Sequence, residues 1–147
     1  MPSKRRLNST WFFRITDANL NRSREGLRVC EDISRFILED KYLSREFRTL
    51  RHRLTKITNL FGFPRLLKNR NVMNDIGRIF PLERYKRDLE DIFFANIQRI
   101  KESVRVLEEL SRISDVSLSG KIRYIRFRVY YLERLAYERI QSVCHHR

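Results

Sequence analysis

The sequence is 147 residues long, enough for one domain that buries a hydrophobic core. It carries 32 lysines and arginines against 18 aspartates and glutamates, a net charge of +14, so the expected partner is an anion: a nucleic acid, a membrane surface or a phosphorylated metabolite. No apolar run reaches transmembrane length, residues 1–6 are basic but lack the apolar core of a signal peptide, and the two cysteines have no metal-ligand spacing. We therefore expect a soluble cytoplasmic protein that has no membrane partner.

Helical periodicity dominates the chain, because only four glycines and three prolines interrupt it and strand alternation is nowhere sustained. The pattern predicts helices at residues 9–39, 44–61, 81–113 and 118–143. Ser9 or Thr10 is expected to cap the first helix, Ser44 the second, and Ser117 or Ser119 the fourth. Pro81 is expected at the first position of the third helix. Short connections join these helices into a first hairpin at 9–61 and a second at 81–143, separated by a linker at 62–80.

An internal repeat relates the two hairpins. The pattern Asn-x-x-Arg-x-x-Glu-x-x-Arg-x-x-Glu begins at Asn19 and returns 77 residues later at Asn96. A weaker match follows, in which Leu-Arg-His-Arg at 50–53 corresponds to Ile-Arg-Phe-Arg at 125–128, 75 residues later. The repeat predicts an all-α fold, a four-helix bundle built from two pseudo-symmetric hairpins about an approximate internal two-fold axis.

Each repeat places polar residues within an apolar helical stripe. At about 100° per residue, Asn19 lies at the centre of the predicted core face of its helix, and Arg22 lies about 60° from it. Asn96 and Arg99 take the same positions in the third helix. Each hairpin therefore directs one amide and one guanidinium group toward the interior of the bundle.

Two interpretations of these inward arginines stay open. Glu25 and Glu102 follow them by three residues, close enough for structural Arg–Glu pairs that fix helix register. The alternative is a polar pocket in which the arginines hold phosphate groups and the asparagines hold a base or a hydroxyl group. Arg51 and Arg126 flank the apolar stripes of the other two helices and would complete a ring of guanidinium groups around that pocket.

Three other features have simpler expected roles. Arg28, Glu31 and Arg35 are expected to point away from the core as an outer ladder of salt bridges. Cys30 is expected to pack in the core rather than to act as a nucleophile. The sequence has no glycine-rich phosphate loop of the ordinary kinds.

The linker at 62–80 is long for a compact domain, and such stretches are usually functional or disordered. It carries Arg70 as a cation for phosphate and Asp75 as a carboxylate for a metal ion, followed by the flexible Gly77. One hypothesis is therefore a lid over an anionic ligand, and the other is a plain connection between the hairpins.

At these residues the chain resembles a known family, the small all-helical hydroxymethylpyrimidine phosphate kinase domain found alone or fused N-terminally to thiamine phosphate synthase. The resemblance covers roughly residues 14–112. It is carried by Asp-Ala-Asn-Leu-Asn-Arg at 17–22, the second copy around Asn96, Leu-Arg-His at 50–52, Arg70, and Asp-Ile-Gly at 75–77. Asn71 departs from the family pattern, which has an acidic or hydroxyl residue there. The barrel domain of the synthase does not fit in 147 residues, so coupling of pyrimidine to thiazole is not expected.

The resemblance implies ATP-dependent phosphorylation of hydroxymethylpyrimidine phosphate to its diphosphate in thiamine biosynthesis, with Mg²⁺ accompanying ATP. It implies Asp75 and Arg70 as catalytic residues, with Asp75, Glu25 and Glu102 as candidate metal ligands. The implied substrate-binding residues are Asn19, Arg22, Arg51, Asn96, Arg99 and Arg126. The expected partners are the phosphorylated pyrimidine, ATP and thiamine phosphate synthase, and a homo-oligomer is compatible with the sequence.

Two alternatives belong to other classes: a basic helical module that binds nucleic acid, and a kinase-like fold kept as a non-catalytic partner or sensor of thiamine enzymes. Basic residues concentrate at 41–70, which has nine against one acidic residue, and at 118–147, which has seven against two. That bias and the tyrosines of the last helix favour nucleic acid. The inward Asn–Arg pairs do not, because a nucleic-acid footprint lies on the surface.

Overall fold

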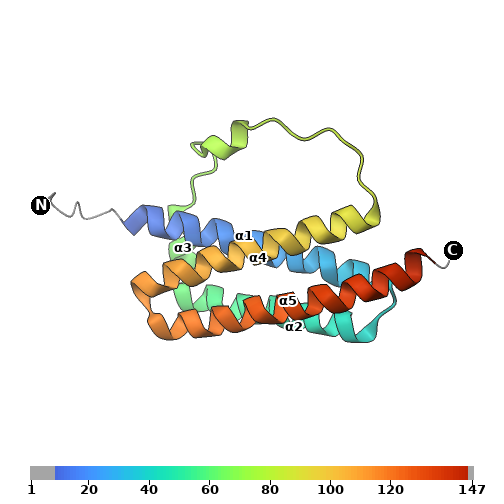
Figure 1. Ribbon diagram of the computed structural model, residues 1–147. Helices are drawn as coiled ribbons and strands as arrows, with labels where there is room; N and C mark the ends of the chain where they lie inside the picture. Colours follow the sequence, from blue (N-terminus) through green and yellow to red (C-terminus); the bar gives the residue numbers. More distant parts are fainter. Residues whose placement is uncertain (1–8, 146–147) are drawn as a thin grey trace, which may run out of the picture.

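The computed structural model describes residues 9–145, which form five α-helices and one 3₁₀-helix and contain no strand (Figure 1). The predicted all-α class is therefore confirmed. Four helices are long: α1 (Ser9–Phe36), α2 (Lys41–Phe61), α4 (Leu89–Ser114) and α5 (Val116–Cys144). The basic segment at residues 1–6 lies outside the described residues. Within residues 9–145 no helix has both the length and the apolar character needed to cross a membrane.

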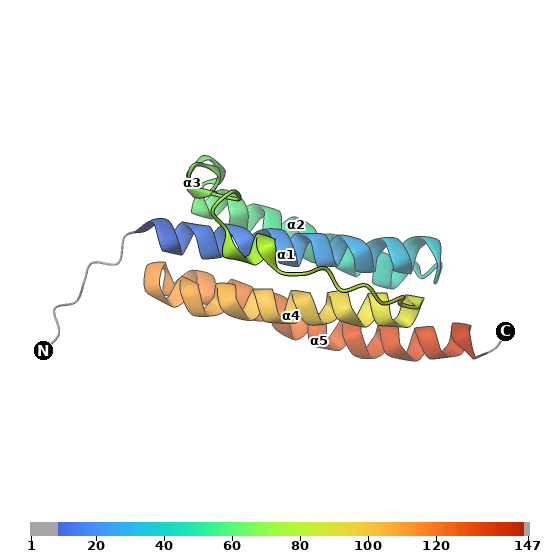
Figure 2. The same ribbon diagram turned by 90° about the horizontal axis from the view of Figure 1, so that it is seen from above.

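The α1–α4 pair is the centre of the arrangement. α1 packs against both α2 and α4, and α4 packs against α5, whereas α2 and α5 have little contact with each other. In the two views α1 and α4 lie side by side and run in opposite directions, with α2 and α5 beneath them (Figures 1 and 2). The connection between the hairpins crosses over the outer face of the α1–α4 pair.

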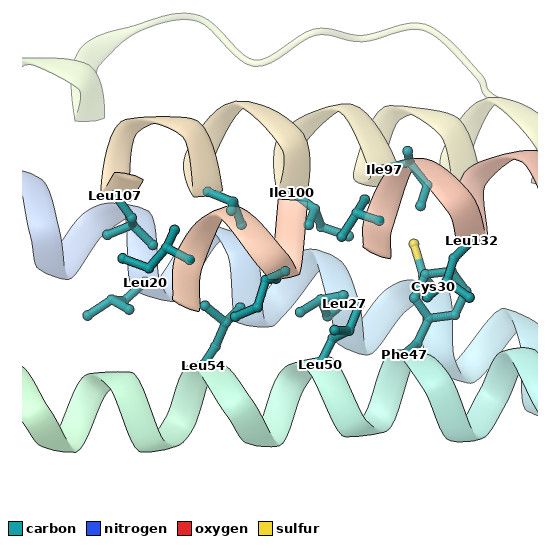
Figure 3. Close-up of a cluster of buried hydrophobic side chains, with 14 of the residues drawn as sticks. Leu20, Leu27, Cys30, Phe47, Leu50, Leu54, Ile97, Ile100, Leu107 and Leu132 are labelled. Carbon is teal, nitrogen blue, oxygen red and sulfur yellow. The ribbon is translucent and has the colours of Figure 1, made fainter. Parts of the chain in front are cut away.

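Side chains from all four long helices fill the interior. Figure 3 shows the core in close-up, with these residues labelled: Leu20, Leu27, Cys30, Phe47, Leu50, Leu54, Ile97, Ile100, Leu107 and Leu132. Burying an aliphatic or aromatic side chain of this size contributes about 1.5–3 kcal/mol, so this core is the main source of stability. Cys30 is completely buried, and burial raises the pKa of its thiol, in agreement with the expected packing role.

The third long helix begins at Leu89 rather than at residue 81, because a strong N-terminal cap lies at Asp88. The Asp88 carboxylate accepts the backbone N–H of Asp91 at 2.8 Å, and the Asp91 carboxylate accepts the backbone N–H of Asp88 at 3.4 Å. This reciprocal pair satisfies two N–H groups that the first turn leaves free. Pro81 instead lies in an exposed segment without regular structure.

The predicted serine caps of α2 and α5 are wrong for a similar reason. α2 begins three residues earlier than expected, where Asp40 accepts the backbone N–H of Leu43 at 2.9 Å. α5 begins at Val116, where Asp115 accepts the backbone N–H of Ser117 at 3.0 Å. Hydrogen bonds from Ser117 hold the pKa of Asp115 below its usual value. In each case the carboxylate of an aspartate that precedes the serine accepts a backbone N–H group of the first helical turn.

The linker is partly structured. It contains the short helix α3 (Phe63–Asn69), which packs on α1 and α2, and the 3₁₀-helix η1 (Ile76–Ile79), which packs on none of the described helices. Every residue from 71 to 86 is exposed. We call residues 70–88 the crossover segment.

The α1–α4 pair is in close contact at Gly26. A Cβ atom added there would lie 2.8 Å from Cγ1 of Ile100 and 3.2 Å from the backbone oxygen of Asn96. We predict that Gly26→Ala lowers the free energy of unfolding by about 1–3 kcal/mol, because α4 must move or Ile100 must leave its rotamer. Urea denaturation measures this change.

Gly120 in α5 is the matched control for this substitution, because an added Cβ would meet no atom within 4 Å. Gly120→Ala should stabilise the protein by about 0.5–1 kcal/mol through helix propensity alone. If both variants were stabilised equally, close contact at Gly26 would not determine the spacing of α1 and α4.

Candidate anion-binding groove

A cavity of about 570 Å³ lies on the outer face of the α1–α4 pair, on the side that the crossover segment spans (Figure 2). We call it the α1–α4 groove. It is lined by Asn19, Arg22, Glu25, Gly26, Asn96, Arg99, Glu102, Ser103 and Val106. Six of these nine residues are the Asn, Arg and Glu of the two sequence repeats. The fold therefore brings both copies of the pattern into one site, because α1 and α4 pass each other with these residues at the same level.

The two arginines do not point into the bundle interior, so the predicted inward position of Arg22 and Arg99 is wrong. Both are exposed, whereas Asn19 is only 4% exposed and Asn96 is half-buried. The apolar stripe of α1 packs against two neighbours, α2 and α4, and the edge of that stripe faces the groove. The asparagines therefore form the floor of the groove, and the arginines form its rim.

Hydrogen bonds orient the two amides in the same way. The side-chain NH₂ of Asn19 donates to the backbone oxygen of Ile15 at 2.9 Å, and that of Asn96 donates to Ile92 at 2.8 Å. The Asn19 Oδ1 atom then accepts from the Arg22 guanidinium at 3.4 Å. Each amide thus uses its donor on its own helix and leaves its oxygen available to the groove.

The structural Arg–Glu pairs that the three-residue spacing suggested are not formed. In residues 9–145, neither Arg22 nor Arg99 lies within 4.0 Å of a carboxylate oxygen, and Glu102 accepts a hydrogen bond from Gln98 at 3.1 Å instead. Two guanidinium groups and two carboxylates therefore line one groove without neutralising each other. Such a groove can bind anionic oxygens through its arginines and a cation through its carboxylates.

Arg51 and Arg126 do not face this groove, so the expected ring of guanidinium groups is wrong. The Nη2 atom of Arg51 lies 3.0 Å from Glu31, and Nε of Arg126 lies 2.8 Å from Glu108. Glu31 and Glu108 are 5% and 2% exposed, which also corrects the expected outward direction of Glu31. The hydrogen bond to Glu108 raises the pKa of Arg126. A buried carboxylate must be paired, so these arginines are committed to structural ion pairs.

The repeat itself carried the signal for these pairs. Glu31 and Glu108 are related by the 77-residue offset, and Arg51 and Arg126 by the 75-residue offset. Each hairpin therefore joins its two helices through an equivalent ion pair. Superposition of the two whole hairpins stays a prediction.

Arg70 anchors one end of the crossover segment to α1. Its Nε and Nη2 atoms donate to the two carboxylate oxygens of Asp17 at 2.7 and 2.8 Å. This bidentate hydrogen bonding raises the pKa of Arg70. Asp17 is 6% exposed and was missed as a site residue, although it begins the Asp-Ala-Asn-Leu-Asn-Arg string that carries the family resemblance.

Asp75 lies on the exposed part of the crossover segment and does not line the groove. Its carboxylate accepts the backbone N–H of Gly77 at 2.8 Å and so begins η1. The two residues expected to be catalytic thus sit on one segment above the groove, Arg70 at its tethered end and Asp75 on its free part.

The geometry defines an all-α protein with a polar groove suited to anions, and comparison with known proteins places it in a family. The model of the ThiD2 family matches residues 14–135, so the chain belongs to the ThiD2 family. That membership connects the chain with thiamine biosynthesis. No solved structure matches it significantly.

Curated relatives agree with this assignment. The chain is 40% identical over 123 residues to a thiamine-phosphate synthase of Thermosynechococcus vestitus, and 38% identical over 122 residues to one of Synechocystis. Each match covers 82% of this chain and 34% of the relative. A thiamine-phosphate synthase of Rhodopirellula baltica is 34% identical over 119 residues. The chain therefore spans about a third of the length of the curated relatives it matches.

Proposed function

We propose that this protein phosphorylates hydroxymethylpyrimidine phosphate to its diphosphate with ATP, as a step of thiamine biosynthesis. The observation that carries the proposal is the meeting of both repeats in the α1–α4 groove, where two asparagines, two arginines and two glutamates line about 570 Å³. Family membership supports the pathway, and the resemblance of the motif supports the reaction.

The roles of the groove residues follow from the demands of phosphoryl transfer, which needs mainly positioning and charge neutralisation. Arg22 and Arg99 have no carboxylate partner among the described residues and would hold the phosphate oxygens of donor and acceptor. The oxygens of Asn19 and Asn96 would accept hydrogen bonds from the amino or hydroxyl groups of the substrates. The acceptor is already a phosphate, so the groove needs no strong general base.

The carboxylates of the groove fit a magnesium ion that arrives with the nucleotide. Mg²⁺ prefers one or two carboxylates together with substrate phosphates, and bound there it would reduce the negative charge on the phosphates. Glu25 and Glu102 line the groove and would supply those carboxylates. Among residues 9–145 no group of three or more histidine, cysteine, aspartate or glutamate side chains is placed to hold a metal ion.

A coupled assay with ATP, Mg²⁺ and hydroxymethylpyrimidine phosphate tests the proposal directly. We expect ADP and the pyrimidine diphosphate to form in equal amounts, with no ADP when the pyrimidine is left out. A folded protein that binds the pyrimidine phosphate without turning it over would favour the non-catalytic partner role instead.

We further predict that Asp75→Asn lowers the turnover number at least tenfold, whereas the free energy of unfolding changes by less than about 0.5 kcal/mol. Stability should not change, because asparagine can cap η1 and η1 packs on no described helix. Turnover should fall, because closure of the segment over the groove would bring the carboxylate to the nucleotide.

Limited trypsin digestion provides the second readout for the crossover segment. Cleavage after Arg78, an exposed residue of η1, should slow when ATP-Mg²⁺ and the pyrimidine phosphate are both present. If cleavage did not change in an enzyme verified as active, the crossover segment would be only a connection between the hairpins, and Asp75 would have no catalytic role.

A further inference from the structure

A second cavity, of about 920 Å³, is lined by residues of α2 and α5. These two helices lie beneath the α1–α4 pair in Figure 1. We call this space the α2–α5 cavity. It exists because these two helices have little contact with each other, so the bundle opens between the C-terminal half of α2 and the first turns of α5. The α2–α5 cavity and the α1–α4 groove share no lining residue, so they are separate sites.

The formally charged side chains that line the α2–α5 cavity are all basic. Its lining includes Arg53, Lys56 and Lys121 together with His52, and it includes no aspartate or glutamate. In residues 9–145 none of the three cations has a carboxylate oxygen within 4.0 Å. Uncompensated like charges in one concave site repel each other, and an anionic ligand would relieve that repulsion.

The cavity also offers a surface for an aromatic ring. Tyr124 is 47% exposed there, and Leu60 is 65% exposed. The Arg53 guanidinium lies 4.8 Å from the centre of the Tyr124 ring, which adds a second flat surface on which a heteroaromatic ring can stack.

Gly120 helps to keep the cavity open. A glycine within a helix costs about 1 kcal/mol relative to alanine, and it is usually explained by close packing or by a left-handed backbone. Neither applies at Gly120, where an added Cβ would meet nothing within 4 Å and the backbone has no positive φ. The space that a side chain would occupy belongs to the cavity lining.

We infer that the α2–α5 cavity is a second ligand site, which binds an aromatic polyphosphate of nucleoside diphosphate size in its metal-free form. The lysines and Arg53 take the phosphates, and Tyr124 with Leu60 takes the ring. A cavity of this volume suits such a ligand. Because the lining has no carboxylate, binding does not require Mg²⁺, in contrast to the carboxylate-bearing α1–α4 groove. This site lies outside the proposed phosphoryl-transfer groove, so the inference does not depend on that function.

Isothermal titration of the protein with ADP in EDTA tests the inference. We expect the wild type to bind, and Lys56→Gln/Lys121→Gln to lose at least tenfold in affinity, because the two lysines supply charged contacts to the phosphates. Gly120→Leu should lose binding by filling the cavity. Arg112→Gln/Arg134→Gln, which removes the same number of charges at exposed positions outside both sites, should bind ADP in EDTA as the wild type does. Thermal melting verifies that each variant is folded.

Other outcomes decide against the site. Absence of binding in EDTA, or binding that the lysine pair leaves unchanged, overturns the inference. If pyrophosphate binds as tightly as ADP, the aromatic ring adds nothing to the affinity, and the aromatic part of the inference is wrong. An octauridylate that binds through the same lysines more tightly than ADP makes this surface a nucleic-acid interface instead. The titration needs no turnover, so lysine-dependent binding of ADP stands even if the kinase assay fails.

Discussion

Replacing Arg22 and Arg99 together by alanine should weaken binding of the pyrimidine phosphate by at least about a hundredfold and leave the melting temperature nearly unchanged. Each charged hydrogen bond is worth about 1.5–3 kcal/mol, roughly tenfold or more in affinity. The two guanidinium groups lie on the rim of one groove and have no carboxylate partner within residues 9–145, so their positive charge is available to a ligand.

Stability should not change greatly, because both side chains are exposed and substitutions at such positions usually stay within about 0.5 kcal/mol. In a protein of this length that corresponds to a shift of about 1–2 °C. The measurements are affinity by titration and melting by circular dichroism. Arg112→Ala/Arg134→Ala is the control, because it removes two exposed arginines and the same charge away from the groove. If melting collapsed while the remaining folded protein bound normally, these arginines would be structural.

The opposite result is expected at Arg51, whose replacement by alanine should lower the free energy of unfolding by about 3 kcal/mol. Removing one partner of a buried ion pair leaves the other charge uncompensated, which typically costs about 3–5 kcal/mol. Glu31 is 5% exposed and has no other cation within 4.0 Å among the described residues. The loss should lower the melting temperature by about 6–12 °C.

Three comparisons make this result specific to the buried charge. Arg126→Ala should cost less, because Arg105 also lies 3.8 Å from Glu108. Adding Glu31→Gln to the Arg51→Ala variant should restore much of the lost stability, because it removes the uncompensated carboxylate. Arg28→Ala breaks only an exposed pair with Asp32 and should cost about 0–1 kcal/mol. If Arg51→Ala melted normally but no longer bound the ligand, Arg51 would be a ligand-binding residue rather than part of a structural ion pair.

The amino-acid sequence alone predicted the all-α class, and its repeat contains six of the nine residues that line the groove. Helical periodicity is a local property, so it located four long helices and the end of α2 at Phe61. The repeat located the groove, since Asn19 and Asn96 mark equivalent levels of two helices that pack side by side in opposite directions. Cys30 was assigned correctly because it lies on the apolar stripe of α1.

The direction of each charged side chain was decided only by the tertiary structure. Arg22 and Arg51 both lie at the edge of an apolar stripe, and periodicity cannot tell which edge faces solvent and which faces a buried carboxylate. The answer depends on how α1 rotates between α2 and α4. The bond from Arg70 to Asp17 joins residues 53 positions apart, so no local pattern reports it. Long-range pairing and helix rotation follow from core packing, which the whole chain sets together.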